Sequence, residues 1–120
     1  MIKIKIPFCL PSLNDYVDAC RSNAYKGSGH KKKVERDIMW CLPKVTVDTP
    51  VFVKFIWHEP TKRRDKDNVA FAKKYILDAL QKKKILPNDN NKWIIGFSDD
   101  FVYGSEGVEV LLIQKEEGNV

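Results

Sequence analysis

The chain has 120 residues, of which 43% are hydrophobic, and its 21 lysines and arginines against 16 aspartates and glutamates give a formal net charge of +5. A chain of this length holds one modest core, so we expect a single domain spanning residues 1–120. No apolar run approaches the ~20 residues that cross a bilayer, which excludes a membrane-spanning helix, and three cysteines without a CxxC spacing or a secretory leader favour the cytoplasm.

The first third of the chain predicts one strand and two helices. Isoleucine alternates with lysine over residues 2–6, which is the period of a half-buried strand. After a turn at residues 11–14, residues 15–21 predict a short helix. The glycine-containing stretch 27–29 is expected to break the chain. Apolar residues at helical spacing then predict a second helix between Val34 and Pro43.

The remaining chain predicts strands around one long helix. Residues 51–57 alternate as a strand covered on one face and partly on the other. Asn68 can cap a helix that runs to about Lys83. A polar turn at 87–91 precedes strands at 92–97 and 107–114. These elements predict an α+β domain in which a mixed β-sheet is packed by two or three helices. The apolar stripe of the long helix consists of Val69, Ala72, Ile76 and Leu80.

Aromatic residues are expected mainly in the interior. Trp40, Trp57 and Trp93 are predicted to be at least partly buried. Phe71 and Tyr75 form a second apolar patch on the opposite side of the long helix. Packing against another segment and a subunit interface both remain open for this patch.

Positive residues cluster in short runs at 31–33, 62–66 and 82–84, whereas many acidic residues lie late in the chain. Such runs suit a nucleic-acid backbone. The alternative is a solvated surface that keeps a small protein soluble. The runs predict the following DNA-binding residues: Lys31, Lys32, Lys33, Lys62, Arg63 and Arg64.

Three aspartates flank the long helix: Asp65 and Asp67 before it and Asp89 after it. Two residues apart in extended chain, the carboxylates of Asp65 and Asp67 project from one side and can share a hard cation. Mg²⁺ suits such a site, because it takes few carboxylates and keeps water molecules whose pKa it lowers. Helix capping and turn formation are the alternative use of these aspartates. The basic run 62–64 immediately upstream favours the metal site.

Lys73 falls on the apolar face of the long helix, near Ile76 and Leu80. Lysines seldom occupy such positions without a partner. Its ammonium could stabilise charge on a scissile phosphate beside bound metal. Alternatively, its stem packs on the apolar face and its head reaches water. Lys74 points well away from the stripe and is expected to be solvated.

A series of short motifs runs in order through the second half of the chain: Arg63-Arg64-Asp65-Lys66-Asp67-Asn68, Lys73, Ile76-Leu77-Asp78-Ala79-Leu80 and Leu86-Pro87-Asn88-Asp89. Together they resemble the signature of the RusA family of Holliday-junction resolvases. Residues 11–16 and 107–110 resemble the two ends of that family's domain, so the similarity covers nearly the whole chain. The R-D-x-D-N motif with a D-A-L helix and a downstream aspartate is specific in combination.

The resemblance implies a RusA-like fold and a homodimeric, structure-selective endodeoxyribonuclease of a bacterium, phage or prophage. Such an enzyme resolves four-way junction DNA during recombination and repair by paired symmetric nicks. The reaction uses Mg²⁺, for which Mn²⁺ can substitute, and no small-molecule cofactor. The alternatives are a nuclease acting on other branched nucleic acid and a non-catalytic junction-binding protein.

The resemblance also implies roles for individual residues. Asp65, Asp67 and Asp89 match the essential acidic residues that hold the metal. Lys73 matches the catalytic lysine, with Lys74 as the adjacent candidate. Two positions depart from the family pattern, namely Lys84, where relatives commonly have glycine, and Asn88, where a pair of aspartates is common. A lysine at 84 must adopt a left-handed helix-end conformation or avoid it.

Overall fold

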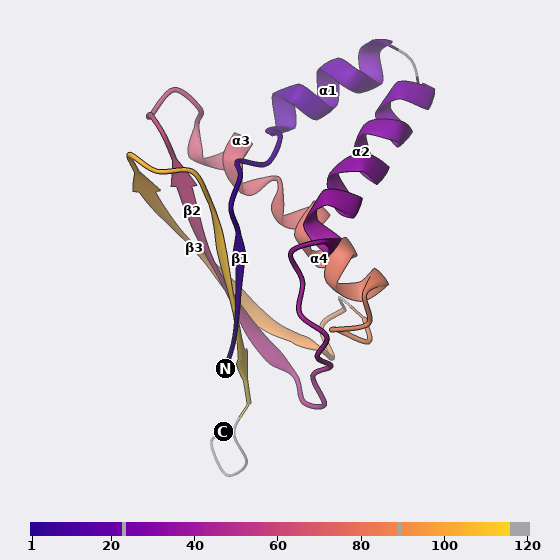
Figure 1. Ribbon diagram of the computed structural model, residues 1–120, viewed down its shortest axis with the longest axis vertical. Coiled ribbons are helices and arrows are strands. Elements are labelled where there is room, and N and C mark those ends of the chain that lie inside the picture. Colours follow the sequence, from indigo (N-terminus) through magenta and orange to yellow (C-terminus); the bar gives the residue numbers. More distant parts are fainter. Residues whose placement is uncertain (23, 89, 116–120) are drawn as a thin grey trace.

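The protein is described by a computed structural model that covers residues 1–22, 24–88 and 90–115, apart from the side chains of residues 24–26. The described chain forms one α+β unit whose helices gather on one side of a four-stranded mixed sheet (Figure 1). The strands are β1 (Ile2–Ile6), β2 (Val51–Glu59), β3 (Ile94–Tyr103) and β4 (Gly107–Gln114). The helical segments are α1 (Leu13–Ser22), α2 (Ala24–Met39), α3 (Lys66–Ala70) and α4 (Lys73–Lys82).

The strand order is β1-β4-β2-β3, with β3 parallel to β2 and the other neighbours antiparallel. Every second residue of β2 from Val51 to Glu59 is buried beneath the helices. Phe55 and Trp57 stack on each other there, with ring centroids 5.4 Å apart. Burying side chains of this size stabilises the fold by about 1.5–3 kcal/mol each. The α+β class and the mixed sheet are therefore confirmed. None of the helices in the described ranges combines the length and hydrophobicity that a membrane crossing requires.

The two outer elements of the sequence, β1 and β4, have the predicted bounds, whereas β3 does not. β3 was predicted at 92–97 but begins at Ile94 and continues to Tyr103. The prediction stopped before the polar residues Ser98 to Asp100 in the middle of the strand. Pairing with β2 in register up to Glu59 opposite Tyr103 keeps this segment extended. β2 also ends later than predicted, at Glu59.

The predicted break at residues 27–29 is wrong, because α2 runs through both glycines. A Cβ atom at Gly27 would lie 2.6 Å from the Sγ atom and 3.3 Å from the Cα atom of Cys20 in α1. Glycine is thus required here by the close approach of two helices, which lie side by side in Figure 1. Helix α1 also begins earlier than predicted, because Ser12 and Asp15 form a reciprocal capping box: Asp15 Oδ2 accepts from Ser12 N at 2.9 Å, and Ser12 Oγ accepts from Asp15 N at 3.3 Å.

The single helix predicted from Asn68 to Lys83 is instead two segments, α3 and α4, and the N-cap is Asp65. Between them the N–H of Ala72 bonds to the carbonyl of Val69, and that of Lys74 to the carbonyl of Phe71, at 3.1 and 3.2 Å. These tight i→i−3 bonds separate the segments and leave Lys73 as the first residue of α4. The predicted apolar stripe survives the break, because all four of its residues are buried.

One helix end and two of the three tryptophans agree with the sequence predictions. Lys84 does adopt the left-handed conformation, with a φ of 61°. Trp57 is buried and Trp93 half-buried, as predicted, but Trp40 beyond the end of α2 is 85% exposed. The patch of Phe71 and Tyr75 is covered by Tyr16 of α1, with ring centroids 5.6 and 6.4 Å away.

Candidate metal and nucleic-acid site

The loop after β2 ends at Asp65, the N-cap of α3, and Asp67 is the second residue of that helix. The predicted extended geometry, in which both carboxylates project from one side, is therefore wrong, because the chain is already helical at Lys66. The backbone of Asp65 is extended (φ −66°, ψ 150°), and its carbonyl accepts the first helical hydrogen bond, from the N–H of Val69 at 3.0 Å. Its carboxylate makes no capping hydrogen bond. The carboxylate of Asp67 accepts a hydrogen bond from the N–H of Asn68 at 3.0 Å. Both side chains are exposed. Helix capping therefore does not explain an aspartate at position 65, because its carboxylate bonds to no backbone N–H of the helix.

Arg64, which precedes Asp65 in the chain, is bound to other parts of the fold. Arg64 makes a bidentate ion pair with buried Glu59, with Nε–Oε1 and Nη2–Oε2 distances of 2.7 and 3.0 Å. It also donates to the carbonyl of Leu10 at 3.0 Å. Arg64 therefore ties the end of β2 to the segment before α1, because a bidentate pair fixes both distance and orientation. Among the described residues, neither Asp65 nor Asp67 has an ion-pair partner.

Two exposed carboxylates without a cationic partner are suitable ligands for a hard divalent cation, which prefers oxygen donors. Mg²⁺ in particular is commonly held by one or two carboxylates and keeps the rest of its shell for water and phosphate. The third predicted ligand, Asp89, lies outside the described residues. Within them, no group of three histidine, cysteine, aspartate or glutamate side chains could hold a metal ion.

Lys73 has the partner that its place on the apolar face requires. Its Nζ atom donates to Asp99 Oδ2 in β3 at 2.8 Å, and buried Trp57 donates its Nε1–H to Asp99 Oδ1, also at 2.8 Å. The side chains of Lys73 and Asp99 are only 17% and 25% exposed. Lys74 instead pairs with Asp78 of α4 at 3.1 Å. Lys74, which the sequence predicts to be solvated, is thus on the exposed side of α4. Lys73 is on the side that faces β3.

Sequence reasoning missed Asp99. It lies two residues after Phe97 and shares its face of β3, a periodicity that would have placed Asp99 beside the helix if the strand had been extended past residue 97. The Nζ atom of Lys73 also lies 3.9 Å from the ring centroid of Phe97 and 5.4 Å from that of Phe55. The ammonium is therefore held by one carboxylate and two aromatic rings.

The predicted DNA-binding residues differ in their surroundings. Lys31 reaches Asp78 of α4 at 3.2 Å, and Lys33 pairs with Asp37 at 3.5 Å. Lys32 and Arg63 are exposed. The remaining two are Lys62, whose Nζ atom lies 5.2 Å from the ring centroid of Tyr103, and Arg64, which belongs to the pair with Glu59.

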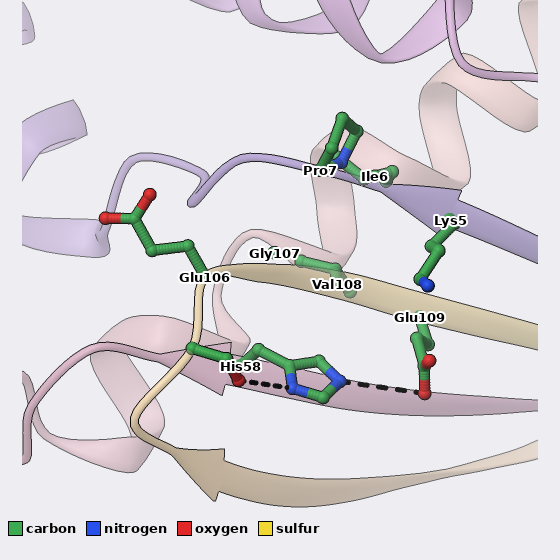
Figure 2. Close-up of a pocket in the computed structure, with 9 residues that line it drawn as sticks. Lys5, Ile6, Pro7, His58, Glu106, Gly107, Val108 and Glu109 are labelled. Carbon is green, nitrogen blue, oxygen red and sulfur yellow. Dashed lines mark hydrogen bonds and ion pairs between the residues drawn. The ribbon is translucent and has the colours of Figure 1, made fainter.

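A separate pocket of about 390 Å³ lies near the ends of β1 and β2 and the start of β4 (Figure 2). His58, whose spacing in the sequence suggests no metal partner, contacts Ser105 Oγ through Nδ1 at 2.9 Å and faces Glu109 through Nε2 at 3.6 Å. Glu109 also pairs with Lys3 at 3.8 Å. None of the predicted site residues that the structure describes lines this pocket, so it is distinct from the acidic site at α3.

No protein-family model matches this chain, and no curated protein matches it. The fold and the site together define an α+β domain with two exposed carboxylates and an aromatic strand, β3, over which lysines from neighbouring elements lie.

Proposed function

We propose that this protein is a metal-dependent endonuclease that hydrolyses phosphodiester bonds in branched DNA, in the manner of the RusA-type Holliday-junction resolvases that its motifs resemble. The observation that carries the proposal is the carboxylate of Asp65, which begins α3 without capping it. Helix capping was the competing explanation for the R-D-x-D-N motif, and it does not account for this side chain. A cation bound at the start of α3 by Asp65, with Asp67 as a second ligand, would account for it.

In the proposed site, Asp65 and Asp67 hold Mg²⁺ or Mn²⁺, with Asp89 as the third ligand that the motif supplies. Bound metal would lower the pKa of a coordinated water and offset the charge on the phosphate. Lys73 uses one of its three donors on Asp99 and keeps two for a phosphate oxygen. Its position is fixed because Asp99 is itself held by Trp57.

Paired cuts on a four-way junction need two such sites related by a twofold axis, which matches the symmetry of the junction. The active species that we propose is therefore a homodimer. A single nick per binding event, with a monomer in solution, would instead favour a nuclease for other branched DNA.

The test is cleavage of a synthetic four-way junction by the full chain in Mg²⁺, in EDTA and with the variant Asp67→Asn. We expect symmetric nicks in Mg²⁺ and none in the other two conditions. Asp100→Asn is the matched control, because Asp100 lies on the helix-free face of the same sheet, paired with Lys54 at 3.3 Å. Cleavage that persists in EDTA would overturn the mechanism.

Metal binding can be measured without activity. The free Mn²⁺ signal in electron paramagnetic resonance should fall when wild-type protein is added, and should fall less with Asp67→Asn. If both bind Mn²⁺ equally, the acidic site is misassigned. If neither protein cuts but both bind junction DNA, a binding protein is the better description.

A further inference from the structure

Three aromatic side chains lie on the helix-facing side of β3, with Asp99 between the first and the second. They are Phe97, Phe101 and Tyr103, and we call them the aromatic strip. In register with β2 they sit opposite residues that the helices bury: Val53, Trp57 and Glu59. The strip is not buried in the same way, because β3 is an edge strand. Phe97 is 52% exposed, and Phe101 and Tyr103 are half-exposed.

Lysines from the neighbouring elements lie over these rings. The Nζ atom of Lys66 is 5.7 Å from the ring centroid of Phe101 and 5.8 Å from that of Tyr103. Lys62 contacts the ring of Tyr103, and Lys73 that of Phe97, as described above. The strip therefore combines flat apolar faces with lysines over all three rings, of which Lys73 is paired with Asp99.

The strip adjoins the proposed metal site. Lys66 stands between Asp65 and Asp67 in the sequence, and its side chain reaches across to β3. The lysine that lies over Phe101 and Tyr103 is therefore the chain neighbour of both aspartates.

Exposed aromatic rings on a sheet surface, together with lysines, match the chemistry of an unpaired nucleic-acid strand. Unpaired bases offer their flat faces to aromatic side chains, while lysines contact the phosphates. Bases inside a duplex are stacked on one another and cannot use the rings. Stacking of a base on a ring is also stronger than an exposed contact between lysine and a ring. A base can thus replace Lys62 or Lys66 over the strip, and the lysine can move to the phosphate.

We propose that the aromatic strip binds an unpaired segment of DNA by stacking its bases and holds it against the acidic site. That the strand is DNA rests on the proposed function. The consequence is selectivity: the protein binds where base pairs have opened, as at a branch point, and binds continuous duplex less well.

The experiment is fluorescence anisotropy of a labelled oligothymidine with the full chain in EDTA, so that no cleavage occurs. We expect Phe97→Leu and Tyr103→Leu each to weaken binding roughly 5- to 150-fold, as the loss of one stacked base would. Tyr103→Phe keeps a ring and should bind as wild type does. Val102→Ala is the matched control, because Val102 is 42% exposed on the opposite face of the same strand.

A second readout separates stacking from simple contact. A strand carrying 2-aminopurine should lose fluorescence on binding to wild type and keep it on binding to Tyr103→Leu. Circular dichroism of each variant checks that it folds. Wild-type affinity in both leucine variants, or equal affinity for a duplex of the same length, would overturn the inference.

These outcomes are independent of the nuclease. If Asp67→Asn binds oligothymidine as wild type does but fails to cut a junction, both proposals stand. If wild-type protein cuts no junction yet the strip variants lose oligothymidine binding, the strip inference stands and the proposed function fails.

Discussion

Tyr75 is a buried tyrosine whose hydroxyl finds no hydrogen-bond partner within the described part of the chain. Its ring lies among those of Tyr16, His30 and Phe71. Burial, followed by nearby ionisable groups, raises its pKa to about 12. A buried hydroxyl without a hydrogen-bond partner lowers the free energy of unfolding. The aromatic ring of Tyr75, and not its hydroxyl, therefore stabilises the fold.

We therefore expect Tyr75→Phe to be as stable as wild type at pH 7, or more stable by up to ~1 kcal/mol. Since the folded-state pKa exceeds the unfolded value of 10.0, the unfolded chain loses this proton first as the pH rises. The stability that comes from keeping Tyr75 protonated in the folded state is thus fully present below pH 10 and is lost between pH 10 and about 12. Urea unfolding at pH 9 and pH 11 should show a larger loss for wild type than for Tyr75→Phe. Equal losses would contradict this assignment.

The ion pair between Lys73 and Asp99 was predictable from the sequence only in part. The helical period alone indicated that Lys73 needed a partner. It could not identify Asp99, because that contact depends on the register between β2 and β3, which the sequence does not specify locally. The exposure of Trp40 was equally hidden, since it depends on where α2 ends relative to the sheet.

Asp99→Asn should destabilise the protein by about 1–3 kcal/mol, because it leaves the mostly buried ammonium of Lys73 without its anion. Asparagine can still accept from Trp57 through its carbonyl oxygen, so the fold should persist. The neighbouring Asp100→Asn, whose exposed pair with Lys54 contributes little, should change the free energy of unfolding by no more than ~0.5 kcal/mol. Chemical denaturation of the two variants checks the difference; equal effects would mean that the Lys73–Asp99 pair contributes no more than a surface pair.

Among the secondary-structure elements, strands with a regular apolar pattern were predicted correctly, whereas the glycines of α2 wrongly predicted a break in the chain. β1 alternates cleanly and β4 buries Val108, Val110 and Leu112 on one face, and both strands were predicted at both ends, because period two fixes which face is buried. Gly27 and Gly29 look alike in the sequence and suggested a turn. In the fold they differ: Gly27 is buried against Cys20, while nothing lies within 4 Å of a Cβ at Gly29. Only the packing of α1 on α2 distinguishes them.

The two glycines give a matched pair of variants. Gly29→Ala should stabilise the protein by about 0.5–1 kcal/mol, because alanine favours the helix and meets no neighbour. Gly27→Ala gains the same helix propensity but forces its methyl group towards Cys20, so it should be less stable than Gly29→Ala by about 1–3 kcal/mol. Thermal unfolding of both variants would measure the difference. Equal melting temperatures would show that α1 and α2 do not approach as closely as described.

For the whole molecule, the sequence predicted the class of fold, because hydrophobic period and turn residues are local properties. It could not predict which charged side chains can contact a ligand, because that depends on ion-pair partners from elements distant in the sequence. Lys31 belongs to one of the most positive runs of the chain, yet Asp78 of α4 lies 3.2 Å from its Nζ atom. Lys62 and Lys66 instead lie over aromatic rings of β3.

The different surroundings of these lysines predict which of them bind DNA phosphates. Affinity for DNA falls with salt in proportion to the number of phosphates neutralised, by ~0.7–0.9 in the logarithmic slope for each. The double variant Lys62→Gln/Lys66→Gln should therefore lower the slope by roughly 1.4–1.8. Lys31→Gln/Lys33→Gln has the same change in charge, but each lysine is already paired with an aspartate, so the slope should change by clearly less. Anisotropy titrations with junction DNA at several salt concentrations measure both. A larger effect from the second variant would move the DNA-binding surface from β3 to α2 and would leave the aromatic strip without a phosphate-binding rim.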